Sequence, residues 1–222
     1  RARGQLRRPP RTRHRRTRFP APGAAADWDE VLNHLPSGGK EPRVRELTLS
    51  YRIPAPNLEL ANKVLAFAAP DLSPPTAVRS VGAPPRIIEV RDSAGTSVEQ
   101  LVERSVAIVE EESEALGGGS VAVIAPESLI DLVDAALKAR SIDYGRATTA
   151  SRNVSGPLHP KIALVPVQLV KGLELDGTVV IEPATILDEE PQGLRALFVA
   201  LTRSTKRLAV VHARSLPDVL QD

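Results

Sequence analysis

Apolar residues along this chain fall into two kinds of segment, and their alternation predicts an α/β fold. Short, nearly continuous apolar runs such as VAVIA at residues 121–125 are typical of strands that a parallel sheet buries on both faces. Longer segments repeat apolar residues at helical spacing, as residues 96–116 do through Leu101, Ile108 and Val109. We expect strands at residues 45–49, 86–90, 120–125, 161–167, 178–181 and 207–212, and helices at 28–35, 55–69, 96–116, 127–140 and 192–202.

The order of these elements predicts one domain and one tail. Strands separated by helices of this length form βαβ units, which make the sheet mostly parallel and cover both of its faces with helices. We therefore expect residues 27–222 to fold as a single α/β domain. Residues 1–26 are expected to lie outside it.

Charge separates that tail from the domain. Residues 1–18 contain nine arginines and no acidic residue, whereas the other residues carry 20 Lys and Arg against 27 Asp and Glu, a net charge of −7. A basic, proline-containing segment with few apolar residues cannot form a core, so we expect it to be disordered. Two interpretations stay open. The tail is a basic arm that binds nucleic-acid phosphates, or it is an artefact of a shifted reading frame or start site.

Composition excludes several kinds of site. The chain has no cysteine, which excludes disulfides and thiolate metal sites. Its four histidines lack the spacing of a helical zinc site, so we expect no metal to be held by side chains of this chain alone. The apolar runs are far shorter than the roughly 20 residues that cross a bilayer. We expect a soluble, cytoplasmic protein with no membrane partner.

Three polar segments beside the predicted strands contain the candidate chemistry. They are LTLSYRIP at residues 47–54, VQLVKGLELDG at 167–177 and FVALTRSTKRL at 198–208. Each has an ordinary explanation when taken singly: a surface arginine at a helix start, a β-turn before a buried strand, or an amphipathic helix that ends in basic residues. In this order and spacing, the three resemble the fourth, fifth and sixth motifs of the UvrD/Rep family of superfamily 1 helicases.

This resemblance covers residues 28–213 and implies the second RecA-like motor domain of such a helicase. In the family, ATP binds in the cleft between two RecA-like domains, of which the first contributes the phosphate loop and the Mg²⁺ ligands. No G-x-x-x-x-G-K-[ST] sequence occurs in this chain. We therefore expect the C-terminal half of an ATP-dependent DNA helicase or translocase, which hydrolyses no ATP when it is alone.

The resemblance assigns roles in ATP hydrolysis to two arginines. Arg203 matches the arginine finger of the sixth motif, and a planar, permanently charged guanidinium suits contact with a transferring phosphoryl group. Arg52 follows an aromatic residue, as does the fourth-motif arginine that reaches the γ-phosphate. Thr202 and Lys206 are expected to position the Arg203 loop, and Arg207 to cap a helix or form a structural pair.

The fifth motif supplies the expected nucleotide contacts. Glu174 matches the glutamate that contacts the ribose, Lys171 adds positive charge, and Gly172 lets the backbone turn sharply beside a ligand. Gln168 and Thr202 are the residues expected to face nucleic acid. Many relatives have histidine at the position of Gln168, where glutamine can form hydrogen bonds but carries no charge.

The resemblance implies that the chain binds single-stranded DNA and ATP with Mg²⁺. The residues that coordinate the Mg²⁺ are expected in the missing first motor domain. The sequence VVIEPATIL at residues 179–187 is most similar to the HelD-like branch, some of whose members act on RNA polymerase, so polymerase recycling is one alternative. The other alternative is that the chain is not an enzyme. It is then a binding module for nucleic acid or RNA polymerase, or an inactive fragment of a truncated gene.

Overall fold

The computed structural model describes residues 13–15, 32–34, 44–91, 95–148 and 161–221, and the chain divides into two compact units, Arg1–Thr48 and Leu49–Asp222. In the first unit, strand β1 (Arg13–Arg15) pairs in parallel with β2 (Val44–Glu46). The boundary expected after residue 26 and most of the helix expected at residues 28–35 fall outside the described residues. The other elements named below belong to the second unit.

A six-stranded parallel sheet forms the centre of the second unit, in the order β5-β10-β9-β6-β8-β7. β6 and β8 are buried along their whole length, as their unbroken apolar sequences predict. The expected parallel sheet is confirmed. Its strands are β5 (Arg86–Glu89), β6 (Val121–Ala125), β7 (Tyr144–Arg146), β8 (Ile162–Pro166), β9 (Leu175–Ile181) and β10 (Ser204–His212).

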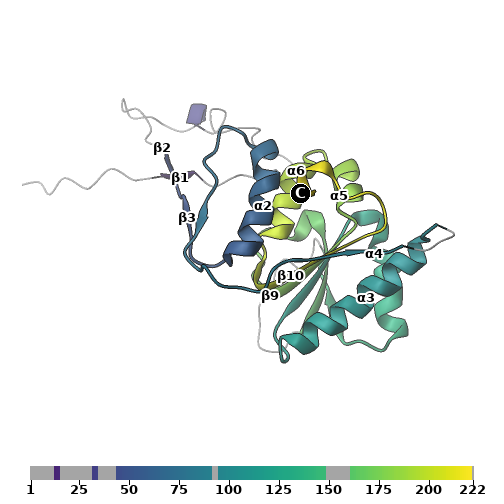
Figure 1. The fold of residues 1–222 in the computed structure, drawn as a ribbon. Helices are drawn as coiled ribbons and strands as arrows, with labels where there is room; N and C mark the ends of the chain where they lie inside the picture. The colour runs from purple at the N-terminus through teal and green to yellow at the C-terminus, as the bar shows by residue number, and fades with distance from the viewer. Residues whose placement is uncertain (1–12, 16–31, 35–43, 92–94, 149–160, 222) are drawn as a thin grey trace, which may run out of the picture. The chain divides into compact units, whose positions relative to one another are not determined.

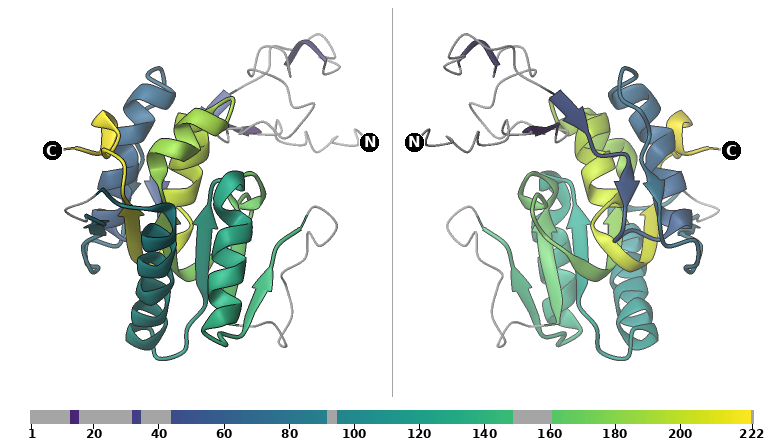
Figure 2. Two further views of the ribbon diagram at one scale, coloured as in Figure 1. Left: turned by 90° about the vertical axis from the view of Figure 1, so that its right-hand side faces the viewer. Right: turned by 90° about the vertical axis from the view of Figure 1, so that its left-hand side faces the viewer.

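Helices cover both faces of this sheet, as expected (Figures 1 and 2). On one face, α3 (Val98–Ala115) and α4 (Glu127–Ala139) pack on a core that they share with β6, β8, β9 and β10. On the other face, α6 (Gly193–Leu201) packs on β9 and contacts both α2 (Ala55–Ala68) and α5 (Pro183–Glu189). No helix within the described ranges combines the length and apolar character that a membrane span needs.

Local sequence fixes both ends of α3. The Ser97 hydroxyl accepts a hydrogen bond from the Gln100 N–H, and the Gln100 side chain accepts one from the Ser97 N–H, so a capping box starts the helix. Gly117 and Gly118 have positive φ angles of 61° and 86°, which end it. Between these ends, Glu112 lies on the buried face of the helix with the apolar residues.

The structure differs from the expected elements in short or polar segments. The prediction of one strand at residues 45–49 is wrong, because β2 ends at Glu46 and β3 (Leu49–Ser50) pairs with a different strand. β3 pairs with β4 (Thr76–Ala77), which lies within a proline-rich stretch where we expect no strand. The sequence also does not predict β7 or α5, since a strand of three residues and a helix of seven are too short to show a clear apolar period.

Candidate functional site

The loops before β9 and β10 lie side by side at the amino ends of these two neighbouring strands. Leu175, the first residue of β9, is paired with Ser204, the first residue of β10. The Leu175 N–H also donates to the Arg203 carbonyl oxygen at 3.3 Å. Glu174 and Arg203, which come directly before these strands, are therefore brought together although the sequence separates them.

Arg52 joins them from the start of the second unit. It follows β3, and its Nη1 lies 2.7 Å from Oε1 of Glu174. The two side chains are 55% and 52% exposed, so water and solutes reach this ion pair. Arg203 reaches the same segment, because its Nη1 donates at 3.3 Å to the carbonyl oxygen of Leu173, the residue before Glu174. The structure thus brings three of the predicted residues into one cluster, the amino-edge cluster of Arg52, Glu174 and Arg203.

Arg203 is the most enclosed member of the amino-edge cluster. Its Nε donates to the Val199 carbonyl oxygen at 3.0 Å, and its Nη1 to the Leu173 carbonyl oxygen at 3.3 Å. Its Nη2 donates to Oγ1 of Thr202 at 3.2 Å. Burial lowers the pKa of Arg203, Arg52 acts in the same direction, and Glu174 opposes them. These bonds hold the guanidinium in place and leave one N–H on each terminal nitrogen for a ligand.

The turn between Lys171 and Glu174 is open to solvent. Gly172 has a φ of +89°, a left-handed conformation that favours glycine, and a Cβ placed there meets nothing within 4 Å. Lys171 is exposed and makes no hydrogen bond or ion pair with the residues that the structure describes. Gly172 therefore serves the backbone turn, and Lys171 adds an exposed positive charge near the amino-edge cluster.

Thr202 lies beneath Arg203 and not on the surface. The residue is 6% exposed, and its hydroxyl lies 2.9 Å from the Phe198 carbonyl oxygen and 3.0 Å from that of Val199. Its oxygen accepts the bond from Arg203. This position favours the expected role of Thr202 in holding the Arg203 loop, and it does not present the side chain to nucleic acid.

Gln168 lies apart from the amino-edge cluster, because it follows the carboxyl end of β8. Its Nε2 donates to Oε1 of Glu190 at 2.7 Å. Burial raises the pKa of Glu190, Gln168 opposes this shift, and the nearby charges of Glu189 and Glu127 raise it further. The surroundings of Gln168 are thus acidic, which is unfavourable for a phosphate backbone.

The remaining basic residues of the 198–208 segment form structural pairs. Lys206 lies 2.9 Å from Asp176, which also accepts a hydrogen bond from the Ser120 N–H. Arg207 pairs with the buried Glu112, so its expected structural pairing is confirmed. Neither residue is aimed at the amino-edge cluster by these contacts.

Three further residues lie around the amino-edge cluster, and none of them has a role in the sequence motifs. Tyr51 is 70% exposed and precedes Arg52, so an aromatic ring is available for stacking beside the charged groups. Arg79 and Asn57 make hydrogen bonds that connect the Arg52 and Arg203 segments. The sequence does point to Tyr51, because it is the aromatic residue directly before the predicted arginine. Arg79 instead lies in a proline-rich stretch with no motif.

Comparison with known proteins shows the fold. No protein-family model matches the chain, and no curated protein matches it. The C-terminal domain of a possible DNA helicase from Lactobacillus plantarum WCFS1 is similar over 77% of this chain and 92% of its own length, with 21% sequence identity and a TM-score of 0.56. The chain thus shares the RecA-like fold of a helicase C-terminal-type domain.

Two larger solved structures are more distant. An arterivirus nonstructural protein 10, a helicase in complex with DNA, has 19% identity over 69% of this chain and a TM-score of 0.37. The Sulfolobus solfataricus SWI2/SNF2 ATPase core in complex with double-stranded DNA has 12% identity over 74% of this chain and a TM-score of 0.41. The chain spans 31% and 32% of the lengths of these two proteins.

Proposed function

We propose that this chain is the second half of an ATP-driven nucleic-acid motor, in which its arginines act on a nucleotide held by a separate first motor domain. The observation that supports this most directly is the convergence of Arg52, Glu174 and Arg203 from three separate segments of the chain. The fold shared with the C-terminal domain of a possible DNA helicase supports it as well.

The chemistry of the amino-edge cluster suits a nucleoside triphosphate. Guanidinium and ammonium groups bind phosphate oxygens, which assigns Arg52 and Lys171 to the phosphate chain. A carboxylate accepts hydrogen bonds from ribose hydroxyls, which assigns Glu174 to the sugar. Arg52 and Glu174 are paired with each other in this structure, so a bound nucleotide must separate them. Because the pair is half exposed, that separation costs about 1 kcal/mol or less.

Arg203 is assigned the role of arginine finger. Its three hydrogen bonds fix the guanidinium before any ligand arrives, so little reorganisation is needed when charge develops on a phosphoryl group. A fixed arginine in this role contributes about 10³ to 10⁵ in rate in characterised nucleotide hydrolases. Arg203 therefore supplies transition-state stabilisation in this proposal, and Arg52 assists it.

A nucleotide at this site would carry Mg²⁺, which would neutralise the negative charge of the phosphoryl oxygens. Its protein ligands are assigned to the first motor domain, because this chain has no phosphate-loop sequence. Within the described ranges, moreover, no three His, Asp or Glu residues gather closely enough to hold a metal ion. The chain alone is therefore expected to bind ATP weakly and to hydrolyse none.

Movement along single-stranded DNA is the activity that we propose for the assembled motor. Closure of the two domains on ATP, and opening after hydrolysis, alternately tighten and release the strand. The variant in which the motor acts on RNA polymerase, as some members of the HelD-like branch do, is part of the same proposal and uses the same ATP site.

A second candidate function is a non-catalytic binding module. The acidic surroundings of Gln168, with Glu127, Glu189 and Glu190, favour a protein partner such as RNA polymerase over a nucleic acid at the carboxyl edge of the sheet. An inactive gene fragment has the same expected properties as this module except that it binds no partner.

ATP hydrolysis tests the proposed function. We expect no DNA-stimulated turnover by the purified chain alone, and turnover after a separately expressed first motor domain from the same genome is added. Arg203→Ala should lower that turnover by about 10³ or more. Arg195→Ala is the matched control, because Arg195 also donates to a backbone carbonyl, that of Ala68, but belongs to α6 away from the amino-edge cluster.

Each outcome of this assay has a distinct meaning. Turnover by the chain alone would show that the nucleotide site is somewhere other than the amino-edge cluster. Equal turnover in Arg203→Ala and Arg195→Ala mixtures would exclude the finger role. Silence in every mixture, together with binding of RNA polymerase, would favour the binding module.

A further inference from the structure

We propose that Arg79 is a positioning residue, which together with the Asn57 and Ser204 side chains clamps the Arg52 segment against the Arg203 segment. We call these three side chains the Arg79 clamp. The inference rests on the proposed function for its consequence, since the clamp matters for nucleotides only if the two arginines act on one nucleotide.

Arg79 is the first part of the clamp. It follows β4, and its Nη1 donates to the Arg52 carbonyl oxygen at 2.8 Å and to the Thr205 carbonyl oxygen at 2.7 Å. Thr205 lies two residues after Arg203, at the start of β10. One nitrogen atom therefore bridges the backbones of the two segments that carry the proposed catalytic arginines. A charged donor makes stronger hydrogen bonds to such carbonyls than a neutral one.

Asn57 and Ser204 connect the same two segments in the interior. Asn57 lies in the first turn of α2, directly after the Arg52 segment, and Ser204 is the residue that follows Arg203. Both residues have no exposed surface, and Nδ2 of Asn57 lies 3.0 Å from the Ser204 hydroxyl oxygen. A buried hydrogen bond between distant segments fixes their relative position, because either group loses its partner if the segments separate.

The backbone of Arg79 is anchored independently of its side chain. Its carbonyl oxygen accepts a hydrogen bond of 2.9 Å from the Ala55 N–H, and the preceding Val78 N–H donates to the Ser50 carbonyl oxygen at 2.8 Å. The Arg79 side chain itself is exposed. Removing the guanidinium should therefore loosen the clamp without unfolding the domain, which makes Arg79→Met a suitable variant.

Two probes report on the two sides of the clamp without any nucleotide. The chain has only two tyrosines, so incorporation of 3-fluorotyrosine gives two ¹⁹F signals, from Tyr51 beside Arg52 and from Tyr144 in the edge strand β7. The Leu175 amide, which donates to the Arg203 carbonyl oxygen, reports on the other side by its hydrogen-exchange rate. In Arg79→Met we expect the Tyr51 signal to move or broaden and the Leu175 amide to exchange about tenfold faster, while the Tyr144 signal stays.

Control variants separate positioning from a general loss of structure. Arg79→Lys keeps a cationic donor near the two carbonyl oxygens and should restore most of the wild-type behaviour. Arg195→Met removes an arginine whose Nε donates to the Ala68 carbonyl oxygen at the far end of α2, and it should change neither probe. Ser204→Ala tests the interior part of the clamp and should resemble Arg79→Met in the Leu175 exchange rate.

Nucleotide affinity completes the test. If Arg52 and Arg203 act together at the terminal phosphate, Arg79→Met should weaken the binding of Mg-ATP by about tenfold and leave that of Mg-ADP nearly unchanged. An unmoved Tyr51 signal, or an unchanged Leu175 exchange rate, would overturn the clamp whatever the nucleotide data show. Changes in both probes support the clamp even if the wild-type chain binds no nucleotide, an outcome that would instead contradict the proposed function.

Discussion

Two clusters of arginine and glutamate in this domain have similar contact distances but different surroundings. In the amino-edge cluster, Arg52 and Glu174 lie 2.7 Å apart and each is about half exposed. In what we call the Glu112 cluster, Glu112 of α3 lies 2.7 Å from Arg86 of β5 and 2.5 Å from Arg207 of β10. Glu112 is only 1% exposed. Burial and not distance therefore distinguishes an ion pair that a ligand can displace from one that holds the fold together.

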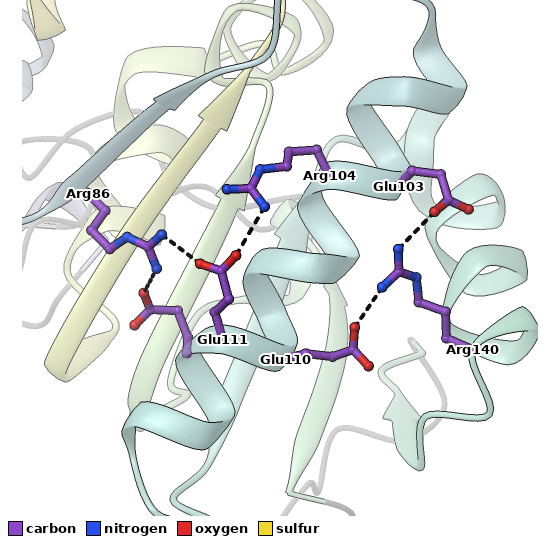
Figure 3. Close-up of polar contacts among 7 residues, drawn as sticks. Arg86, Glu103, Arg104, Glu110, Glu111 and Arg140 are labelled. Atoms are coloured by element: carbon purple, nitrogen blue, oxygen red, sulfur yellow. Dashed lines mark hydrogen bonds and ion pairs between the residues drawn. The ribbon is translucent and has the colours of Figure 1, made fainter.

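Helix α3 also carries exposed ion pairs, which contrast with its buried Glu112. Figure 3 shows Glu111 between Arg86 and Arg104, and Arg140 between Glu103 and Glu110. These pairs are exposed, with Glu111 and Glu110 each more than two-fifths accessible. They add little stability individually, whereas Glu112, their neighbour on the same helix, connects α3 to two strands of the sheet.

The largest expected effect on stability is that of Glu112→Ala. It leaves Arg86 and Arg207 without their buried partner and opens a cavity at the junction of α3, β5 and β10, so we expect a loss of about 3 kcal/mol in the free energy of unfolding. Urea unfolding measures this. Glu111→Ala is the matched control, because Glu111 shares Arg86 but is exposed, and its loss should stay below about 1 kcal/mol. Equal losses in the two variants would contradict the role given to burial.

Unfolding at low pH should also reveal the contribution of the buried Glu112 to stability. Burial tends to raise the pKa of Glu112, but hydrogen bonds from Arg207 and Arg86 outweigh it, so the pKa is lowered in the folded state. A carboxyl group with a lowered pKa stabilises the fold at pH values above its ordinary pKa of about 4.5, and this stability is lost as the pH falls below that value. We expect the stability of Glu112→Gln, measured by urea unfolding at a series of pH values, to fall less steeply between pH 5 and pH 3, at roughly the range where glutamate protonates. An unchanged slope would mean that Glu112 is not the group that titrates.

Loss of the exposed pair should affect ligands and leave the fold almost unchanged. We expect Arg52→Ala and Glu174→Ala to change the free energy of unfolding by about 1 kcal/mol or less. Both should weaken Mg-ATP binding, and Arg52→Ala should weaken Mg-ADP binding less because it acts on the terminal phosphate. Isothermal titration calorimetry and urea unfolding on the same preparations separate the two effects. Strong destabilisation by either substitution would place this pair with the Glu112 cluster.

The smallest predicted effect on stability is that of Glu190→Gln, near the carboxyl ends of the strands. Burial and the charges of Glu189 and Glu127 raise the pKa of Glu190, although Gln168 opposes this shift. A carboxyl group with a raised pKa stabilises the fold below its ordinary pKa, and that contribution is lost as the pH rises. Glu190→Gln should therefore increase stability at neutral pH by roughly 0.5 kcal/mol or less. A decrease in a thermal unfolding experiment would show that the bond from Gln168 matters more than the repulsion.

Hydrophobic pattern was sufficient to predict the framework of this fold. The buried strands β6 and β8 and the amphipathic helix α3 each have a local sequence that agrees with their environment. β4 and β7 could not be predicted, since two- and three-residue strands owe their conformation to a partner strand and not to their own sequence. Helical spacing places Glu112 on the apolar face of α3, but only the tertiary structure shows that Arg86 and Arg207 meet it there.

The candidate site shows the same division. The resemblance of three motifs identified Arg52, Glu174 and Arg203, and the structure brings these residues together. The same resemblance also predicted a nucleic-acid contact at Gln168, but the structure places Gln168 among acidic residues. Arg79 could not be found from sequence, because its function depends on two backbone carbonyl groups, and a carbonyl group leaves no signature in the residue types.

One measurement tests the central claim most directly: the titration of the ¹⁵N-labelled chain with Mg-ATP and, separately, with Mg-ADP, followed by amide chemical shifts. We predict shifts that centre on Arg52, on Gly172 to Glu174 and on Arg203, with larger changes at Arg52 and Arg203 for ATP than for ADP. Arg203→Ala should remove that difference between the two nucleotides. Shifts confined to the carboxyl edge around Gln168, or no shifts at millimolar nucleotide, would contradict the assignment of the amino-edge cluster to a nucleotide.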